Sequence, residues 1–279
     1  MRYLLYNSLS GKANLSYESA KDHASKVKTE KELLDMTKIK SLSDFLRDLN
    51  DGDDVVVFGG DGTLNKIINA LPLSCSNDIY YYPCGTGNDF ARDTGAISGE
   101  PILINDYLKN LPTVSVKGKQ YKFINGVGFG IDGYCCAVGD ELKRKNKNPN
   151  YTSIAIEGLL FHFKPVNAKV TVDGVTQSFN KVWLAPTMYG RYYGGGMMPT
   201  PSQDRNATEK NLSLMVFHET GKLKTLMIFP SLFKGEHIEH KKHVSVLVGK
   251  KITVEFDRPT PLQIDGETIL DVRSYTASV

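Results

Sequence analysis

The sequence predicts an α/β part built on a doubly wound parallel sheet, followed by a part that is mainly antiparallel β. Strand and helix patterns alternate as far as residue 111, and period-two patterns replace them afterwards. The later half also contains the hairpin-type dipeptides Asp173-Gly174 and Asp265-Gly266. At 279 residues the chain exceeds the usual size of one domain, so we expect two domains.

The first half repeats a unit of strand, loop and helix. Residues 2–6 form an apolar strand, a polar loop follows, and an amphipathic helix begins near Tyr17. The expected strands cover 2–6, 33–36, 54–58 and 79–82, and the expected helices cover 17–27, 42–49 and 63–71. Parallel strands end at the same edge of a sheet, so the loops over 7–12, 59–63 and 85–89 should meet along one ligand-binding rim.

The second half alternates apolar and polar residues between turn signals, which is typical of strands with one buried face. Two apolar helical segments are expected to interrupt these strands. The expected strands cover 121–124, 169–172, 182–185, 212–217, 244–248 and 252–256, and the expected helices cover 134–144 and 154–163.

Composition excludes several classes of protein. With 41% hydrophobic and 23% charged residues the chain is globular, and a net charge of +3 is too mild for a nucleic-acid-binding protein. The four cysteines form no CxxC pair, so we expect no zinc site and interpret them as reduced thiols of a cytoplasmic protein. No signal peptide and no apolar run of membrane-spanning length is visible.

The most informative segment is the run from Phe58 to Asn65, FGGDGTLN, which joins a predicted strand to a predicted helix. Glycines let backbone N–H groups approach an anion, and the positive end of the helix dipole favours phosphate. A bare phosphate would repel Asp61, so this acid indicates a divalent cation between protein and nucleotide. The run predicts a nucleotide-using phosphotransferase; the alternative is a tight structural turn.

Two further loops bear on this choice. Residues 85–89, GTGND, form a second glycine-rich loop with an acid after a strand, which makes two coincidental turns a poor explanation. Residues 7–12, NSLSGK, offer hydroxyl, amide and cationic donors to a phosphate tail, although a merely solvated loop is an equal alternative. The phosphate-binding signature GxxxxGK followed by Ser or Thr is absent, so the predicted site is of another type.

Residues 265–267, Asp-Gly-Glu, have two interpretations. The first is a simple hairpin turn. The second applies if this part of the chain folds its tip over the rim: a carboxylate could then accept the proton of a substrate hydroxyl during phosphoryl transfer.

These motifs resemble those of the diacylglycerol kinase catalytic-domain family, especially the soluble bacterial lipid kinases, and more distantly sphingosine and ceramide kinases. Residues 7–11 look like the family's NPxSG, residues 59–65 like GGDGTxN, and residues 83–92 like PxGTGNDFAR. The resemblance spans nearly the whole chain. It implies an ATP-binding α/β domain over 1–112, a β-sandwich lipid-substrate domain over 113–266, and a final segment, 267–279, returning to the first domain.

The resemblance also implies roles for individual residues. Those expected to bind ATP are Asn7, Ser10, Gly11, Thr37, Gly59, Gly60, Asp61, Gly62, Thr63, Asn65 and Thr86. Those expected to organise Mg²⁺ are Asp61, Asp89 and Asp132. Asp265 would be the general base, with Glu267 as the competing candidate.

Three positions depart from the family pattern. Ser8 replaces a proline, which we expect to loosen its loop without removing its donors. Lys66 stands where an acid is common, and residues 209–212, EKNL, stand where the family has DGxL, a segment tied to a structural Mg²⁺. If that metal persists, Glu209 would bind it with the carbonyls of Asn206 and Asn211.

The leading hypothesis is an ATP- and Mg²⁺-dependent lipid kinase that phosphorylates a hydroxyl of diacylglycerol, giving phosphatidic acid. The alternatives are a kinase of the NAD kinase type and a catalytically inactive nucleotide- or lipid-binding regulator. The expected partner is a lipid at the inner face of the membrane, contacted peripherally, and not nucleic acid. The sequence is also compatible with a homodimer.

Overall fold

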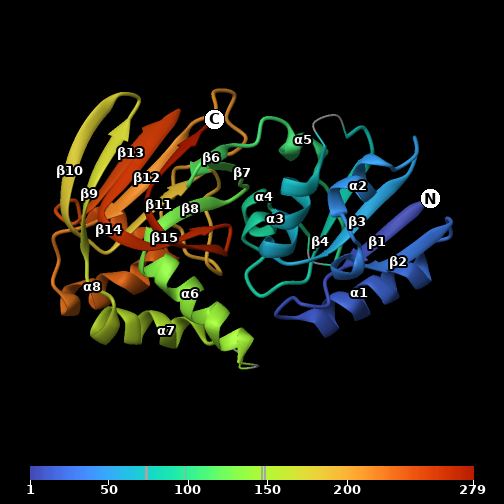
Figure 1. The fold of residues 1–279 in the computed structure, drawn as a ribbon, viewed down its shortest axis with the longest axis horizontal. Coiled ribbons are helices and arrows are strands. Elements are labelled where there is room, and N and C mark those ends of the chain that lie inside the picture. The colour runs from blue at the N-terminus through green and yellow to red at the C-terminus, as the bar shows by residue number, and fades with distance from the viewer. Residues whose placement is uncertain (73–74, 98, 146, 148) are drawn as a thin grey trace. The chain divides into compact units, whose positions relative to one another are not determined.

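The computed structural model describes residues 1–72, 75–97, 99–145, 147 and 149–279. The chain divides into two compact units, Met1–Leu111 and Pro112–Val279 (Figure 1). The division falls one residue before the end of the first domain in the prediction.

The first unit is built on a sheet with strand order β2-β1-β3-β4-β5. Its strands are β1 Arg2–Tyr6, β2 Lys31–Asp35, β3 Asp54–Gly59, β4 Asp78–Pro83 and β5 Ile102–Leu103. Strands β1 to β4 run parallel, which confirms the predicted parallel sheet. The short β5, which the sequence analysis missed, pairs with β4 in the antiparallel sense.

Helices cover both faces of this sheet, with α1 on one face and α2 and α3 on the other (Figure 1). They are α1 Ala13–Lys26, η1 Met36–Lys38, α2 Leu42–Arg47, α3 Asp61–Ala70, α4 Asp89–Thr94 and α5 Asn105–Leu108. Helix α1 begins before the predicted Tyr17 because small residues form its inner side. Ser16 and Ala20 are buried, and the Ser16 hydroxyl donates to the carbonyl of Phe58 at 2.6 Å.

The second unit is built on an antiparallel sheet with order β13-β12-β11-β8-β14-β15-β6-β7, to which β9 and β10 attach through β14. Its strands are β6 Thr113–Val116, β7 Lys119–Lys122, β8 Gly126–Gly130, β9 Val166–Val172, β10 Val175–Val182, β11 Leu184–Met188, β12 Leu212–Phe217, β13 Val244–Gly249, β14 Lys251–Ile264 and β15 Glu267–Ser278. The predicted antiparallel β domain is therefore confirmed. Strand β14 pairs with β9 through residues 252–256 and with β8 through residues 262–264, and its register shifts lie between these two stretches.

The last segment differs from the prediction. Residues 267–279 were expected to return to the first domain, but β15 pairs with β14 and β6 within the second sheet. The turn explains why: Asp265 and Gly266 both have positive φ, at 46° and 90°, so the chain reverses as a tight hairpin. Buried Val272, Tyr275 and Ala277 then anchor β15 in the second core.

Helices of the second unit gather on one side of its sheet, where α6, α7 and α8 lie together (Figure 1). They are α6 Ile131–Arg144, α7 Tyr151–Glu157, η2 Gly158–His162, α8 Lys222–Ile228, η3 Phe229–Phe233 and η4 Glu236–Glu239. The predicted helix over 154–163 is thus α7 followed by a π-helical turn. Its inner residues Ile154 and Leu159 share one core with Trp183, Ile228 and Leu232. Within the described residues, every helix is too short or too polar to cross a bilayer.

Candidate functional site

The two glycine-rich loops of the first unit are in backbone contact. A Cβ atom placed on Gly85 would lie 2.3 Å from the Cα atom of Gly60, and one on Gly60 would lie 3.0 Å from the Cα atom of Gly85. Any side chain at either position would push the loops apart. The structure therefore brings together the loops after β3 and β4, as the parallel sheet predicted.

Helix α3 begins at this contact, at Asp61 and not at the predicted Thr63. Gly60 is its N-cap, and its carbonyl accepts the N–H groups of Thr63 and Leu64 at 3.0 Å each. A Cβ on Gly59 would collide with the Thr63 side chain at 2.5 Å, so the strand passes into the helix with little space between them. The first N–H groups of a helix cannot bond within it, and together with the helix dipole they suit an anion.

Asp61 joins the two loops. Its carboxylate accepts hydrogen bonds from the backbone N–H groups of Asp89 and Phe90, both at 3.0 Å. It therefore caps the start of α4, a structural contribution that the sequence analysis did not foresee. The two loops thus meet at Asp61 and Asp89, and the role of these acids in holding Mg²⁺ stays a prediction. The described residues include no cluster of three or more His, Cys, Asp or Glu side chains suited to a metal, so any cation here would depend on fewer protein ligands.

The loop after β1 is tied to the same rim. Asn7 is buried, and its side-chain amide donates to the Thr63 hydroxyl at 3.1 Å. The Ser8 N–H donates to the Asp35 carboxylate at 3.4 Å, and the Ser8 and Thr37 hydroxyls are 3.0 Å apart. Ser8 was expected to loosen this loop; instead it supplies a backbone donor that the family's proline lacks, and it ties the loop to the end of β2.

Asp35 is the residue of this rim that the sequence analysis missed. The Thr37 N–H and hydroxyl donate to its carboxylate at 3.1 and 2.8 Å. Burial raises the pKa of Asp35, but the hydrogen bonds from Ser8 and Thr37 outweigh it and hold the pKa below its usual range. The sequence did carry a signal for Asp35: it is the last residue of a strand that ends at this rim, and it stands two residues before Thr37.

The remaining predicted nucleotide-binding residues differ in exposure. Gly11 and Thr86 are exposed and Ser10 is half-buried, whereas Asn65 is buried and accepts a hydrogen bond from the Asn69 side chain at 3.3 Å. Asn88, which was not singled out, closes the second loop: it has φ 52°, and its side chain accepts the Gly85 N–H at 2.8 Å.

The second unit contains the predicted base. Asp265 is buried, and its carboxylate accepts the N–H groups of Ile124, Asn125 and Gly126 at 2.7 to 2.9 Å. Its own N–H donates to the Gly126 carbonyl at 2.9 Å. The Asp265 side chain is thus fixed in one orientation by the segment that leads into β8. Glu267, two residues later, is exposed.

Asp132 lies in the first turn of α6, directly after β8. Its carboxylate is buried against Gly128, where an added Cβ would lie 2.2 Å from Oδ2. Burial raises the pKa of Asp132 to about 7. With this pKa the carboxyl is partly protonated near neutral pH, and a nearby cation would favour the charged form, so a role for Asp132 in holding Mg²⁺ stays a prediction.

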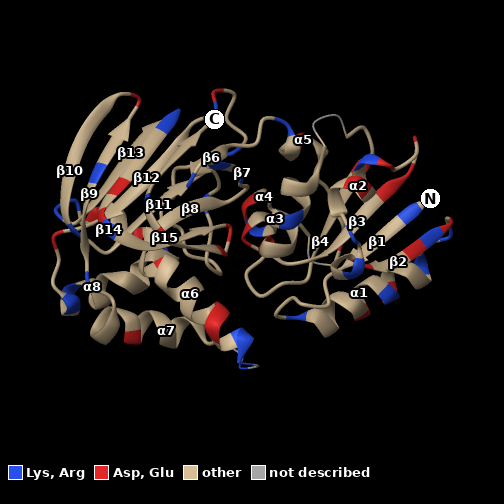
Figure 2. Ribbon diagram, viewed as in Figure 1, with Lys and Arg blue, Asp and Glu red and all other residues tan. Residues whose placement is uncertain are grey.

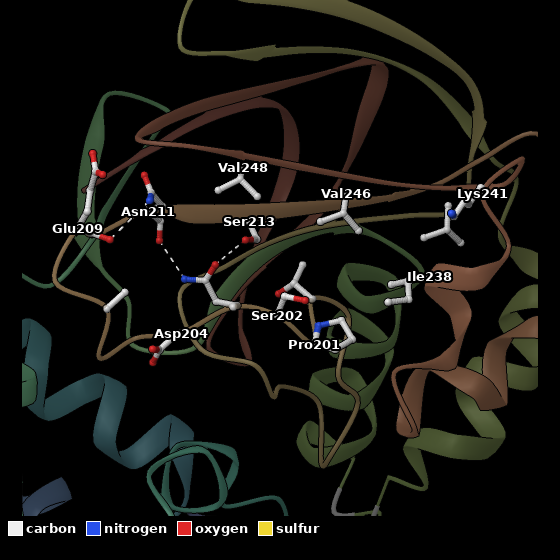
Figure 3. Close-up of a pocket in the computed structure, with 14 residues that line it drawn as sticks. Pro201, Ser202, Asp204, Glu209, Asn211, Ser213, Ile238, Lys241, Val246 and Val248 are labelled. Atoms are coloured by element: carbon white, nitrogen blue, oxygen red, sulfur yellow. Dashed lines mark hydrogen bonds between the residues drawn. The ribbon is translucent and has the colours of Figure 1, made fainter.

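Glu209 lies beside a pocket of about 420 Å³ in the second unit, shown in Figure 3. Val244, Val246 and Val248 form part of its lining. The Glu209 carboxylate pairs with the Lys250 ammonium at 2.9 Å, and this hydrogen bond lowers the pKa of Glu209. The carbonyl of Asn211, which with that of Asn206 was expected to bind the metal beside Glu209, accepts the Gln203 amide at 2.9 Å. Both groups already have protein partners, and the structural Mg²⁺ site remains untested.

Family comparisons cover both units. Residues 2–111 match the diacylglycerol kinase catalytic domain, and residues 125–276 match the YegS C-terminal NAD kinase beta sandwich-like domain. The second match alone spans more than half of the chain.

Individual proteins show the same relationship. A diacylglycerol kinase of Mycobacterium tuberculosis (strain ATCC 25618 / H37Rv) is 29% identical over 214 residues, covering 73% of this chain and 67% of that protein. A diacylglycerol kinase of Bacillus subtilis (strain 168) is 27% identical over 227 residues, covering 78% and 72%. The crystal structure of a diacylglycerol kinase from Bacillus anthracis str. Sterne has a similar fold, with a TM-score of 0.67 at 20% identity over 99% of this chain and 93% of that one.

Proposed function

Since the chain belongs to the diacylglycerol kinase catalytic-domain family, we propose that it is an ATP- and Mg²⁺-dependent lipid kinase. In this proposal the acceptor is a hydroxyl group of diacylglycerol, and the products are phosphatidic acid and ADP. Relatives that are named diacylglycerol kinases support the lipid class, while the choice of diacylglycerol belongs to the proposal.

One observation carries the proposal: the backbone contact between Gly60 and Gly85 at the carboxyl ends of parallel strands. Three segments therefore lie along one edge of the sheet: the start of α3, the turn closed by Asn88, and the loop that contains Asn7. Glycine loops at such an edge are suited to cradle a triphosphate, because their N–H groups and the helix dipole stabilise its negative charge.

The chemistry of the donor set fits Mg²⁺. Asp61 and Asp89 stand at the first positions of α3 and α4, and their carboxylates would supply oxygen ligands to Mg²⁺. In kinases this ion is typically held by one or two carboxylates together with phosphate and water. Bound there, it would neutralise charge on the phosphates. The protein's own contribution is to position the nucleotide through the glycine loops and to accept a proton.

We assign the role of proton acceptor to Asp265. The acceptor oxygen forms a bond to the γ-phosphorus, the bond from that phosphorus to ADP breaks, and the hydroxyl proton passes to the Asp265 carboxylate. Three backbone donors orient this buried carboxylate, whereas Glu267 is exposed to solvent. Orientation matters because a general base must lie within hydrogen-bond reach of the proton it removes.

The test compares Asp265→Asn with Glu267→Gln. Initial rates of ³²P transfer from labelled ATP to dispersed diacylglycerol should fall on the order of a thousandfold in Asp265→Asn and change only a few-fold in Glu267→Gln. ATP affinity should be retained in both, and circular dichroism should confirm that both are folded. Near-normal transfer by folded Asp265→Asn would remove Asp265 from the mechanism, and label on NAD in place of lipid would move the chain to the NAD kinase class.

A further inference from the structure

Helix α8 and the turn η3 expose large apolar side chains. Leu223 is 73% exposed and Met227 is 80% exposed, and their i, i+4 spacing places them on one side of α8. Phe233, at the end of η3, is also exposed. Leu223 and Met227 thus form an exposed apolar pair on α8, and Phe233 adds a third exposed apolar side chain at the end of the following turn.

The π-helical turn η2 extends this surface. Phe161 is 72% exposed, and η2 is in contact with α8. The Lys222 ammonium at the start of α8 donates to the Leu160 carbonyl at 2.7 Å, which fastens the two segments together. Leu159 of η2 and Ile228 of α8 are buried in one core, so the opposite sides of both segments face outward together.

Within residues 221–235 every charged residue is a lysine, and the exposed acids Glu219 and Glu236 lie just outside this segment. Residues 221–235 contain Lys222, Lys224 and Lys234 and no Asp or Glu, and all three lysines are exposed. Figure 2 shows basic and no acidic colour on α8. The turn η2 contains no acid, and Glu157 directly precedes it at the end of α7. We call Phe161, Lys222, Leu223, Lys224, Met227, Phe233 and Lys234 the docking face.

We propose that the docking face binds the surface of an anionic lipid bilayer, with the apolar side chains inserted at the level of the headgroups and the lysines contacting anionic lipid. Apolar side chains flanked by lysines have the composition of interfacial membrane-binding helices, and long lysine stems can lie along apolar surface while their ammonium groups remain in water. A bilayer with negative charge complements this face, whereas a second copy would bring the same lysines against each other. The inference rests on the proposed function, because diacylglycerol lies in such a bilayer.

The test measures binding to vesicles and needs no turnover. The chain of residues 1–279 should co-sediment with vesicles of phosphatidylcholine and phosphatidylglycerol, and should bind vesicles of phosphatidylcholine alone much less. Leu223→Glu/Met227→Glu should weaken binding at least about tenfold, because two inserted apolar groups are replaced by two charges that the lipid repels. Lys224→Glu should weaken it about fivefold or more, with a smaller difference at high salt.

The matched control is Val175→Glu/Val248→Glu. It adds the same two charges at exposed valines of the same unit, on β10 and β13, outside the docking face. It should bind vesicles like the unaltered protein. Equal binding by Leu223→Glu/Met227→Glu and the unaltered protein would overturn the proposal. So would sedimentation velocity showing a dimer that only Leu223→Glu/Met227→Glu dissociates, with no vesicle binding by the unaltered protein.

Phosphorylation of a short-chain, monomerically dissolved diacylglycerol separates this inference from the proposed function. Leu223→Glu/Met227→Glu should keep that activity, because only the docking face is changed. Loss of vesicle binding without loss of this activity supports the docking face. Absence of the activity in every form of the protein would reject the proposed function and leave the vesicle result to decide the docking face.

Discussion

The buried carboxylate of Asp35, at the end of β2, fixes the loop that follows β1. It accepts hydrogen bonds from Ser8 and Thr37, and so holds the loops after β1 and β2 together. Since Ser10 and Gly11 lie in the first of these loops, Asp35 indirectly sets the position of two residues that are expected to contact ATP.

Asp35→Asn should therefore destabilise the protein in a pH-dependent way. The Asp35 pKa is lowered in the folded state, so its stabilising contribution is present above its unfolded pKa and is lost as pH falls through the folded value. We expect a loss of about 1–2 kcal/mol at pH 7 and a smaller loss near pH 4, measured by urea unfolding. Asp51→Asn, at an exposed position, is the control; an equal loss for Asp35→Asn at both pH values would contradict this account.

Sequence reasoning singled out Asp61 and Asp265 but not their hydrogen-bond partners. Asp61 and Asp265 were predicted from glycine-rich and hairpin motifs that each occupy a few consecutive residues. Their donors come from far along the chain: Asp265 is held by residues 124–126, about 140 positions earlier. Such pairings depend on which strands become neighbours, and that information is not local.

At the scale of elements, the contact between the two glycine loops sets the geometry of the proposed phosphate site. Gly85→Ala would place a methyl group 2.3 Å from the Cα atom of Gly60, a distance that real Cβ contacts do not show. The backbone of one loop must move in response.

We expect Gly85→Ala to lower the free energy of unfolding by about 1–3 kcal/mol and to weaken ATP binding at least tenfold, because overpacking displaces the loop that should hold phosphate. Thermal unfolding and calorimetric titration with ATP and Mg²⁺ measure the two effects. Gly221→Ala, where an added Cβ meets nothing within 4 Å, should leave ATP binding unchanged. Unaltered ATP affinity in Gly85→Ala would exclude this loop from the nucleotide site.

The regular elements of the first unit were the most predictable, because alternating strand and helix patterns determine a parallel sheet almost by themselves. Other elements were missed for physical reasons. Strand β5 has only two residues, and the hairpin of β14 and β15 is longer than typical strands because both pair across register shifts. Helix α8 escaped notice since its outward side is apolar, which conceals the amphipathic period that identifies a surface helix.

For the whole molecule, two units with different sheets carry different parts of the proposed reaction. The parallel sheet of Met1–Leu111 ends in loops suited to phosphate, and the antiparallel sheet of Pro112–Val279 fixes the proposed base and carries the docking face. A lipid kinase needs both a soluble and a membrane substrate, so a division of this kind is chemically reasonable. The final segment belongs to the second unit, because β15 pairs there with β14 and β6. The resemblance had instead predicted that it returns to the first domain.

The central claim is that the meeting point of the Gly60 and Gly85 loops binds the phosphates of ATP. The most direct measurement is a crystal structure of the protein with a non-hydrolysable ATP analogue and Mg²⁺. We predict that the phosphates will contact the loops over residues 7–12, 59–63 and 85–89, with the metal beside Asp61 and Asp89. An analogue bound elsewhere, or an empty rim at saturating analogue, would contradict the account.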